Sequence, residues 1–429
     1  MLHNVMKISG VKFGLPCIFM AMLIASLAGC GGGGGGFGDY DVPTATLTVP
    51  LAGQTSNVLM DAATLQGWFD QGLVNNEANF EKVVILDVTS AANYGAGHIP
   101  GAQLWNAGEQ LQTRIEGPAP SVNMVLDGAS MDAMIRKHGI HKNTTIVFTT
   151  SAGGSNTDPS RAYFLFRYWG FPKERLKVLN GYNGGWTAAG KALVTAVPVV
   201  TATDCSVRDD GAFNPGERVS LSELIVALES GVGVPVDFRG DKSAPGSTPG
   251  VFAPAGDFVV FEGLLRNGKP FPFGNFTNAD GTFKDAQVIK NDLAAAGIDN
   301  SQLLYSVCRT GIIASTGYFV LDGLLGWEVM LYDGSWSQWG QLSSNAAMGG
   351  QLPAGSLWAT DNTQLMDIIN YNQPAGFVIE VLAVDNDALA LYPNPALPAA
   401  NRIENEDAQY MVSGGGGSGG GAPAPGYGN

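Results

Sequence analysis

Cys308 is the residue of this sequence best placed to do chemistry. It follows the apolar run 303–307 and precedes a turn that contains Gly311, after which residues 312–325 have helical spacing of apolar residues. A cysteine between a buried strand and a helix start faces unpaired backbone N–H groups and the positive end of the helix dipole. Both favour the thiolate, the nucleophilic form of the side chain. The alternative is a small buried residue, because free cysteine packs well in cores.

One candidate anion-binding cation is adjacent to this thiol in the sequence, and two others lie in an earlier segment. Arg309 follows it directly, Arg239 ends the segment 237–239, and Lys242 lies three residues further on. Arginine suits bidentate recognition of oxyanions, whereas lysine supplies a point charge. We therefore expect the three side chains to bind an anionic substrate. The alternative for Arg239 is an ion pair with Asp237 or Asp241.

The composition is that of a globular, acidic protein. The chain has 429 residues, a formal charge of −15, 45% hydrophobic residues and 14% charged residues. This charge argues against a nucleic-acid partner, which requires a basic surface. No spacing of cysteine and histidine resembles a zinc site, so we expect neither a metal nor another cofactor.

The first 29 residues have the pattern of a signal peptide. Lysines precede an apolar run at 13–27, and the tetrapeptide Leu-Ala-Gly-Cys at 27–30 resembles the lipobox of bacterial lipoproteins. This resemblance implies cleavage before Cys30, lipid on its thiol, and a membrane anchor in the cell envelope, with Gly31 favouring the outer membrane. The alternative is an ordinary signal peptide cleaved near Ala28. Residues 30–56 begin with a glycine run and are predicted to be a tether.

Two successive segments share one order of elements. In the first, strands are predicted at 83–87, 145–149 and 176–180, with a helix at 161–169. In the second, helices at 219–229, 285–296 and 312–325 alternate with strands at 234–239, 303–307 and 328–332. Alternating strands and helices predict an α/β fold, in which a mostly parallel sheet is flanked by helices.

Several motifs together resemble tandem-domain rhodaneses, the thiosulfate and 3-mercaptopyruvate sulfurtransferases. They are Leu-Asp-Val at 86–88 with Gly-His-Ile-Pro-Gly-Ala at 97–102, Asp-Phe-Arg at 237–239, Cys-Arg-Thr-Gly at 308–311 and Tyr-Asp-Gly-Ser-Trp at 332–336. The resemblance implies two rhodanese-like domains, at 57–200 and 219–345, joined by a linker at 201–218. It also implies that the first domain is catalytically silent, because its loop at 149–156 has no thiol.

The family resemblance implies a double displacement through a persulfide on Cys308. A small sulfur-containing anion such as thiosulfate would be the donor, and a thiol or cyanide the acceptor. The anion-binding loop would be formed by Arg309, Thr310, Gly311, Ile312 and Ile313, with Asp237 as a structural acid at a strand end. Thiosulfate-using members have lysine at the position of Thr310, and mercaptopyruvate-using members have Gly-Ser in place of Arg309 and Thr310. The loop is therefore a hybrid, and the donor stays open.

Cys205 lies in the predicted linker. It is a possible resolving thiol, which would exchange with the Cys308 persulfide or form a disulfide with Cys308. The alternative is a thiol packed against the domain interface.

The C-terminal residues extend beyond the rhodanese resemblance. Residues 346–412 are predicted to be a small extension, with a helix at 363–371 and a strand at 376–382, and residues 413–429 to be a disordered Gly/Ser/Pro tail. The whole layout resembles rhodanese-like lipoproteins of selenite and tellurite reduction operons. Two alternatives to an enzyme therefore stay open: a non-catalytic carrier of sulfane sulfur or chalcogen, and a scaffold that contacts an envelope redox partner.

Overall fold

The apolar runs of the first half form a five-stranded parallel sheet in a computed structural model of the chain. The structure describes residues 58–78, 81–116, 119–141, 143–209, 213–239, 264–265, 267–339, 360–361 and 402–413. The sheet order is β1–β7–β6–β2–β3. Every residue of β2 is buried, as is usual where helices cover both faces of a parallel sheet. The strands are β1 (Leu59–Met60), β2 (Val83–Thr89), β3 (Gln103–Asn106), β6 (Thr145–Thr149) and β7 (Leu176–Leu179).

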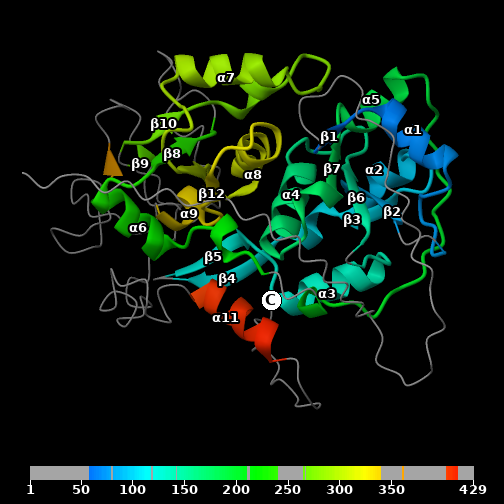
Figure 1. The fold of residues 1–429 in the computed structure, drawn as a ribbon, viewed down its shortest axis with the longest axis horizontal. Coiled ribbons are helices and arrows are strands. Elements are labelled where there is room, and N and C mark those ends of the chain that lie inside the picture. Colours follow the sequence, from blue (N-terminus) through cyan, green and yellow to red (C-terminus); the bar gives the residue numbers. More distant parts are fainter. Residues whose placement is uncertain are drawn as a thin grey trace, which may run out of the picture. The chain divides into compact units, whose positions relative to one another are not determined.

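Helices connect these strands (Figure 1). The side chains of Asp61, Ser90 and Asp127 each accept a hydrogen bond from a backbone N–H of the first turn that follows, which fixes the start of α1, α2 and α3. The helices are α1 (Ala62–Asp70), α2 (Ala91–Ala96), α3 (Gly128–Lys137), α4 (Asp158–Tyr168) and α5 (Tyr182–Ala188).

The second half forms a four-stranded parallel sheet in the order β10–β8–β11–β12. Its strands are β8 (Val234–Asp237), β10 (Lys269–Pro270), β11 (Leu304–Val307) and β12 (Val329–Leu331). Its helices are α6 (Leu221–Ser230), α7 (Ala286–Ala295), α8 (Ile312–Tyr318), which continues as a π-helix over Phe319–Leu324, and α9 (Ser335–Trp339). Ser220 and Glu223 form a capping box at the start of α6.

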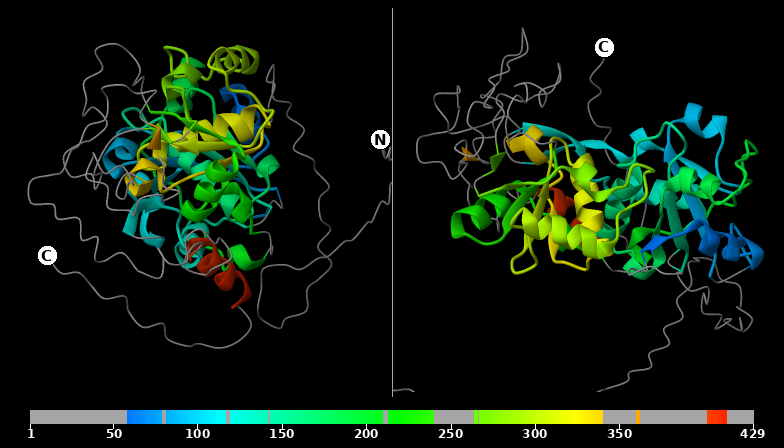
Figure 2. Two further views of the ribbon diagram at one scale, coloured as in Figure 1. Left: turned by 90° about the vertical axis from the view of Figure 1, so that its left-hand side faces the viewer. Right: turned by 90° about the horizontal axis from the view of Figure 1, so that it is seen from above.

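Aromatic side chains of α4 and α8 join the two halves. Helix α4 packs on the first sheet, α8 packs on the second, and the two helices contact each other. The rings of Phe164 and Tyr318 lie 5.1 Å apart, and those of Tyr163 and Phe319 lie 5.2 Å apart. Edge-on aromatic pairs of this kind stabilise a buried interface. Figure 2 shows the ribbon from two further directions.

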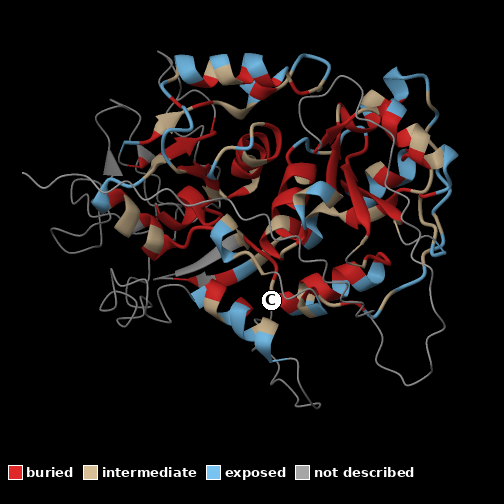
Figure 3. Ribbon diagram, in the orientation of Figure 1, coloured by how far each residue is buried: buried red, intermediate tan, exposed pale blue. Residues whose placement is uncertain are grey.

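Two antiparallel strand pairs and one further helix lie outside the two parallel sheets. Strands β4 (Gln112–Glu116) and β5 (Ala119–Met124) form an antiparallel hairpin, and β9 (Leu264–Leu265) pairs with β13 (Thr360–Asp361). Helix α11 (Arg402–Val412) contacts β4 and α3. Figure 3 shows that the sheets are buried, whereas α7 and α11 each expose one face.

The predicted alternation of strands and helices is confirmed. The strands expected at 83–87, 145–149 and 303–307 are β2, β6 and β11, and the helix expected at 161–169 is α4. The helix expected at 363–371 and the strand expected at 376–382 lie outside the described residues. Helix α11 was not predicted. Among the described helices, none is both long and apolar enough to span a membrane.

Candidate functional site

The carboxyl end of β11 carries the thiol that the sequence singles out. Cys308 follows β11 directly, is a free cysteine, and has 1% of its surface exposed. In open α/β sheets, ligands bind outside the carboxyl ends of the parallel strands. The position of Cys308 is therefore that of a site residue, although a reagent reaches its sulfur only after a local rearrangement.

The start of α9 holds Cys308 in place. The backbone N–H of Cys308 donates to Ser335 Oγ over 3.1 Å, and the same hydroxyl oxygen lies 3.9 Å from the Cys308 sulfur. The N–H of Trp336 donates to the Cys308 carbonyl over 3.1 Å. Ser335 has a φ of +48°, an uncommon backbone conformation for serine that is often found at functional sites. Ser335 thus places a hydroxyl group beside the sulfur at some conformational cost.

The loop from Cys308 to α8 requires glycine at one position. Gly311 has a φ of +79°, and a Cβ atom there would lie 2.5 Å from the carbonyl oxygen of Asp333. Within the described residues, the backbone N–H groups of Thr310 and Gly311 have no hydrogen-bond acceptor. Successive N–H groups of this kind form anion-binding concavities. Ile312 and Ile313, which begin α8, are half-buried beside them.

The predicted cations are placed differently. Arg309 is buried next to the thiol, with 9% exposure. Arg239 is also buried, and its Nε lies 2.8 and 2.9 Å from the two carboxylate oxygens of Asp237. Its guanidinium carbon is 4.9 Å from the ring centre of Trp336, the neighbour of Ser335. The ion pair considered as the alternative for Arg239 is therefore present. Lys242 lies outside the described residues.

A buried ionic cluster packs against the Cys308 loop through Asp333. Asp333, whose carbonyl packs against Gly311, accepts hydrogen bonds from Arg218 Nε and from the backbone N–H of Val125, both over 2.8 Å. Arg218 is fully buried and also makes two 2.9 Å bonds to Glu116. It forms a further ion pair with Glu404 of α11. Sequence reasoning missed Arg218 and Glu404, because their partners lie far apart along the chain.

Helix α11 joins this cluster through charged side chains. Arg114 of β4 makes hydrogen bonds of 2.8 and 2.9 Å to Asp407, and the hydroxyl of Tyr168 donates to the same carboxylate over 2.7 Å. Tyr410 donates to Asp132 of α3 over 2.6 Å. Helix α11 is thus part of the structure that supports the loop.

Glu404 makes the docking of α11 sensitive to pH. Burial raises the pKa of Glu404 to about 8; Arg218 opposes this rise, while Glu116 and Glu223 add to it. A carboxyl group whose pKa is raised in the folded state contributes fully to the stability of that state below its ordinary pKa of 4.5. This contribution is lost as the pH rises towards 8. We therefore expect limited proteolysis to release α11 faster at pH 9 than at pH 6, after correction for the protease's own pH dependence. The Glu404→Gln variant should lose this difference, and equal cleavage of the wild type at both pH values would contradict the prediction.

Cys205 is not joined to Cys308 in this structure, because Cys308 is a free thiol. Cys205 is buried in the linker, and its carbonyl accepts a 2.8 Å hydrogen bond from Arg136 of α3. Cys205 is disulfide-bonded in this structure, so its exchange with a Cys308 persulfide, which needs Cys205 as a thiol, stays a prediction. Cys30 lies outside the described residues.

The corresponding loop of the first sheet, between β6 and α4, is filled by its own side chains. Ser151 Oγ donates to Asp87 over 2.7 Å, and Asn183 donates to the same carboxylate over 2.9 Å. Thr150 Oγ1 donates to the carbonyl of Val88 over 2.9 Å. The side chains of Thr150 and Ser151 therefore point towards the sheet, and the loop contains no cysteine.

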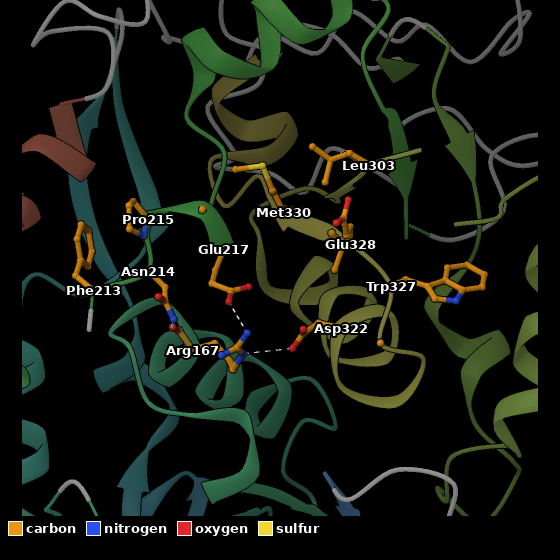
Figure 4. Close-up of a pocket in the computed structure, with 13 residues that line it drawn as sticks. Arg167, Phe213, Asn214, Pro215, Glu217, Leu303, Asp322, Trp327, Glu328 and Met330 are labelled. Atoms are coloured by element: carbon orange, nitrogen blue, oxygen red, sulfur yellow. Dashed lines mark hydrogen bonds and ion pairs between the residues drawn. The ribbon is translucent and has the colours of Figure 1, made fainter. Parts of the chain in front are cut away.

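A separate pocket of about 550 Å³ opens at the other end of the second sheet (Figure 4). Leu303 and Glu328, which line it, directly precede β11 and β12, whereas Cys308 follows β11. Figure 4 shows Arg167 between Glu217 and Asp322, with which it forms ion pairs, and all three residues line the pocket. The pocket is therefore not part of the Cys308 site.

A family model and two curated relatives are similar to this chain. Residues 70–189 match the model of the Rhodanese-like domain. The chain is 30% identical over 268 residues to the sulfur carrier protein TtuD of Thermus thermophilus, covering 61% of this chain and 89% of the relative. It is 28% identical over 289 residues to a Haloferax volcanii protein named "Putative thiosulfate sulfurtransferase", covering 67% of this chain and 94% of the relative.

Solved structures share the fold. The anaerobic ergothioneine biosynthesis enzyme from Chlorobium limicola superposes with a TM-score of 0.53 and 22% identity, over 66% of this chain and 68% of that one. SseA from Escherichia coli, a 3-mercaptopyruvate sulfotransferase, superposes with a TM-score of 0.50 and 19% identity, over 64% of this chain and 97% of that one. At these identities the likeness shows the fold alone.

Proposed function

Because this chain belongs to the rhodanese family, we propose that it is a sulfurtransferase that carries sulfane sulfur on Cys308 as a persulfide. The observation that supports this assignment is the surroundings of the thiol. Within the described residues Cys308 is the free cysteine, it follows a parallel strand, and the Ser335 hydroxyl lies 3.9 Å from its sulfur. The hydroxyl donates to the Tyr332 carbonyl over 2.8 Å, and rotation of its O–H bond would direct the same proton to an anionic sulfur.

The two parallel sheets are, in this proposal, two tandem rhodanese-like domains of which only the second is catalytic. In both sheets a central strand ends in a loop that leads to a buried helix, β6 to α4 and β11 to α8. The family model matches the first half, and the two curated relatives align along about nine-tenths of their own lengths. The thiol is present in the second of the two loops.

The proposed reaction is a double displacement without net oxidation. The Cys308 thiolate attacks the outer sulfur of thiosulfate, a new S–S bond forms, and the old S–S bond breaks so that sulfite leaves with the electron pair. Cyanide or an acceptor thiolate then attacks the terminal sulfur of the persulfide and releases the Cys308 thiolate. The persulfide anion would accept hydrogen bonds from Ser335 and from the N–H groups of Thr310 and Gly311.

The cations near the thiol would bind the anionic sulfur donor. Arg309 is buried beside Cys308, and Arg239 reaches the ring of Trp336 while bound to Asp237. Thr310 replaces the lysine of thiosulfate-using members, so we propose a donor with less negative charge than thiosulfate as an alternative substrate. Comparison of thiosulfate with 3-mercaptopyruvate tests this choice.

Turnover tests the enzyme proposal. We expect the purified chain to form thiocyanate from thiosulfate and cyanide in an amount that exceeds the protein many times over, because each acceptor step regenerates the thiolate. The assay measures thiocyanate released per mole of protein with time. A yield that stops at one thiocyanate per chain would contradict catalysis with these substrates.

A sulfur carrier is the second candidate. The relative from Thermus thermophilus bears the name of a sulfur carrier protein, and the thiol of this chain is buried, with 1% exposure. A carrier would load one sulfur and release it to a partner protein. A stoichiometric yield in the turnover assay, together with a stable persulfide, would favour this function.

We also propose that Cys30 is lipidated and anchors the chain in the cell envelope, at the outer membrane. In the same proposal, the chain carries selenium or tellurium in place of sulfur and contacts a redox partner in the cell envelope. The support is the lipobox-like tetrapeptide at 27–30 and the glycine run that follows it. Labelled fatty acid that is incorporated by the wild type and not by Cys30→Ser would test the anchor.

A further inference from the structure

Asp333 lies beside the Cys308 loop, because the two residues follow neighbouring strands. β11 and β12 are parallel neighbours, and Ser306 pairs with Leu331. Cys308 and Asp333 each come two residues later, at the same edge of the sheet. The backbone of Asp333 occupies the space that a side chain on Gly311 would need: its carbonyl oxygen, Cα and carbonyl carbon would lie 2.5, 2.9 and 3.0 Å from a Cβ atom there. The turn of the loop therefore rests on Asp333, and a shift of Asp333 would displace the turn.

The start of α9 orients the peptide groups of the same loop. The N–H of Trp336 donates to the Cys308 carbonyl over 3.1 Å. The N–H of Ser337 donates to the Arg309 carbonyl over 2.7 Å. In a trans peptide the C=O group and the next N–H group point in opposite directions. Because the Arg309 carbonyl faces α9, the N–H of Thr310 points away from α9, and the start of α9 determines the side on which the loop presents this donor.

The side chain of Asp333 is fixed by two donors. It is fully buried, its Oδ1 accepts a bond from Arg218 Nε, and its Oδ2 accepts a bond from the backbone N–H of Val125, both over 2.8 Å. Val125 directly follows β5, and Arg218 is held in turn by Glu116 of β4. Both anchors of Asp333 therefore lead to the β4–β5 hairpin, which belongs to the first half of the chain.

We propose that Asp333 is a positioning residue for the sulfurtransferase reaction: the β4–β5 hairpin fixes its side chain, and its backbone in turn fixes the loop that loads sulfur onto Cys308. The inference rests on the proposed function and gives the first half, whose own loop contains no cysteine, a part in the reaction. Position matters because a displacement of about 1 Å near a reacting group can slow a reaction about 10²-fold. A purely structural Asp333 would affect the stability of the fold and leave the rate of sulfur loading per folded chain unchanged.

The test is the rate of persulfide formation at a saturating concentration of thiosulfate. Samples are quenched at increasing times, and intact mass gives the fraction of chains that carry the extra sulfur. Asp333→Asn keeps the shape of the side chain, but its amide nitrogen cannot accept a hydrogen bond, so one of the two anchors is lost. We expect the rate constant to fall about 10- to 100-fold, while the final yield per chain stays that of the wild type.

Asp322→Asn is the matched control for this variant. Asp322 forms ion pairs with Arg167 and Lys173, and it lines the pocket at the other end of the second sheet. We expect Asp322→Asn to unfold at a lower urea concentration than the wild type and to load sulfur at the rate of the wild type.

A folded Asp333→Asn protein that loads sulfur as fast as the wild type would overturn the proposal. If this variant does not fold, Arg218→Lys decides, because it keeps the cation and removes the Nε bond to Asp333. Arg218→Lys should also load sulfur more slowly, and a rate equal to that of the wild type would overturn the proposal. Failure of the sulfurtransferase proposal is seen separately, as absence of a persulfide in the wild type after thiosulfate.

Discussion

The Cys308→Ser variant is expected to form thiocyanate from thiosulfate and cyanide at least about 10³-fold more slowly than the wild type. Serine keeps the size and position of the side chain, but its oxygen cannot accept sulfane sulfur as a stable persulfide. The contacts of the backbone with Ser335 and Trp336 involve the N–H and carbonyl groups, so the fold should persist. The measurement is the initial rate of thiocyanate formation at equal protein concentration.

Cys205→Ser is the matched control for this variant. It removes the other cysteine of the described residues and leaves the Cys308 loop intact. We expect it to retain multiple turnover with cyanide as the acceptor. If it loses transfer to thiol acceptors alone, Cys205 acts as the resolving thiol. Substantial turnover by Cys308→Ser, by contrast, would place the sulfur chemistry elsewhere in the chain.

The Arg218→Met variant is expected to lose about 3–5 kcal/mol in the free energy of unfolding. Arg218 is fully buried and is shared by the carboxyl groups of Glu116, Asp333 and Glu404. Removing it leaves three buried carboxyl groups without their common cation, and desolvation makes such groups costly. Unfolding by urea, followed by tryptophan fluorescence, measures the loss.

Arg136→Met provides the comparison for this prediction. Arg136 pairs with Asp132, but 45% of its side chain is exposed. Ion pairs of this kind contribute about 0–1 kcal/mol, so the control should lose little stability. A loss below about 1 kcal/mol in Arg218→Met would show that the cluster is not what holds α11 and the Cys308 loop together.

The strands and the position of the thiol could be predicted from the sequence, because they depend on local patterns. β2 and β6 each contain an apolar run, at 83–86 and at 146–148, and both strands are fully buried. The turn at Gly311 was predicted from its residue type, and its φ of +79° agrees. A buried strand followed by a cysteine and a glycine is visible without any knowledge of the rest of the fold.

The ion pairs that support the site could not be predicted from the sequence, because they join segments that are distant along the chain. Helix α11 docks through Glu404 and Asp407, and a helix with buried acids has the sequence pattern of an exposed one. Arg161 was predicted only as part of a helix, since nothing in its neighbourhood indicates that it lies near Asp333. The pairing of Arg239 with Asp237, two residues apart, was within reach of the sequence and was weighed as an alternative.

The most direct measurement of the central claim is the intact mass of the protein after incubation with thiosulfate. The wild type should gain the mass of one sulfur atom, lose it again on addition of cyanide, and release thiocyanate in the same amount. Cys308→Ser, treated in parallel, should show no gain. A wild type that gains no sulfur from thiosulfate or 3-mercaptopyruvate, or a Cys308→Ser variant that gains as much as the wild type, would contradict a Cys308 persulfide.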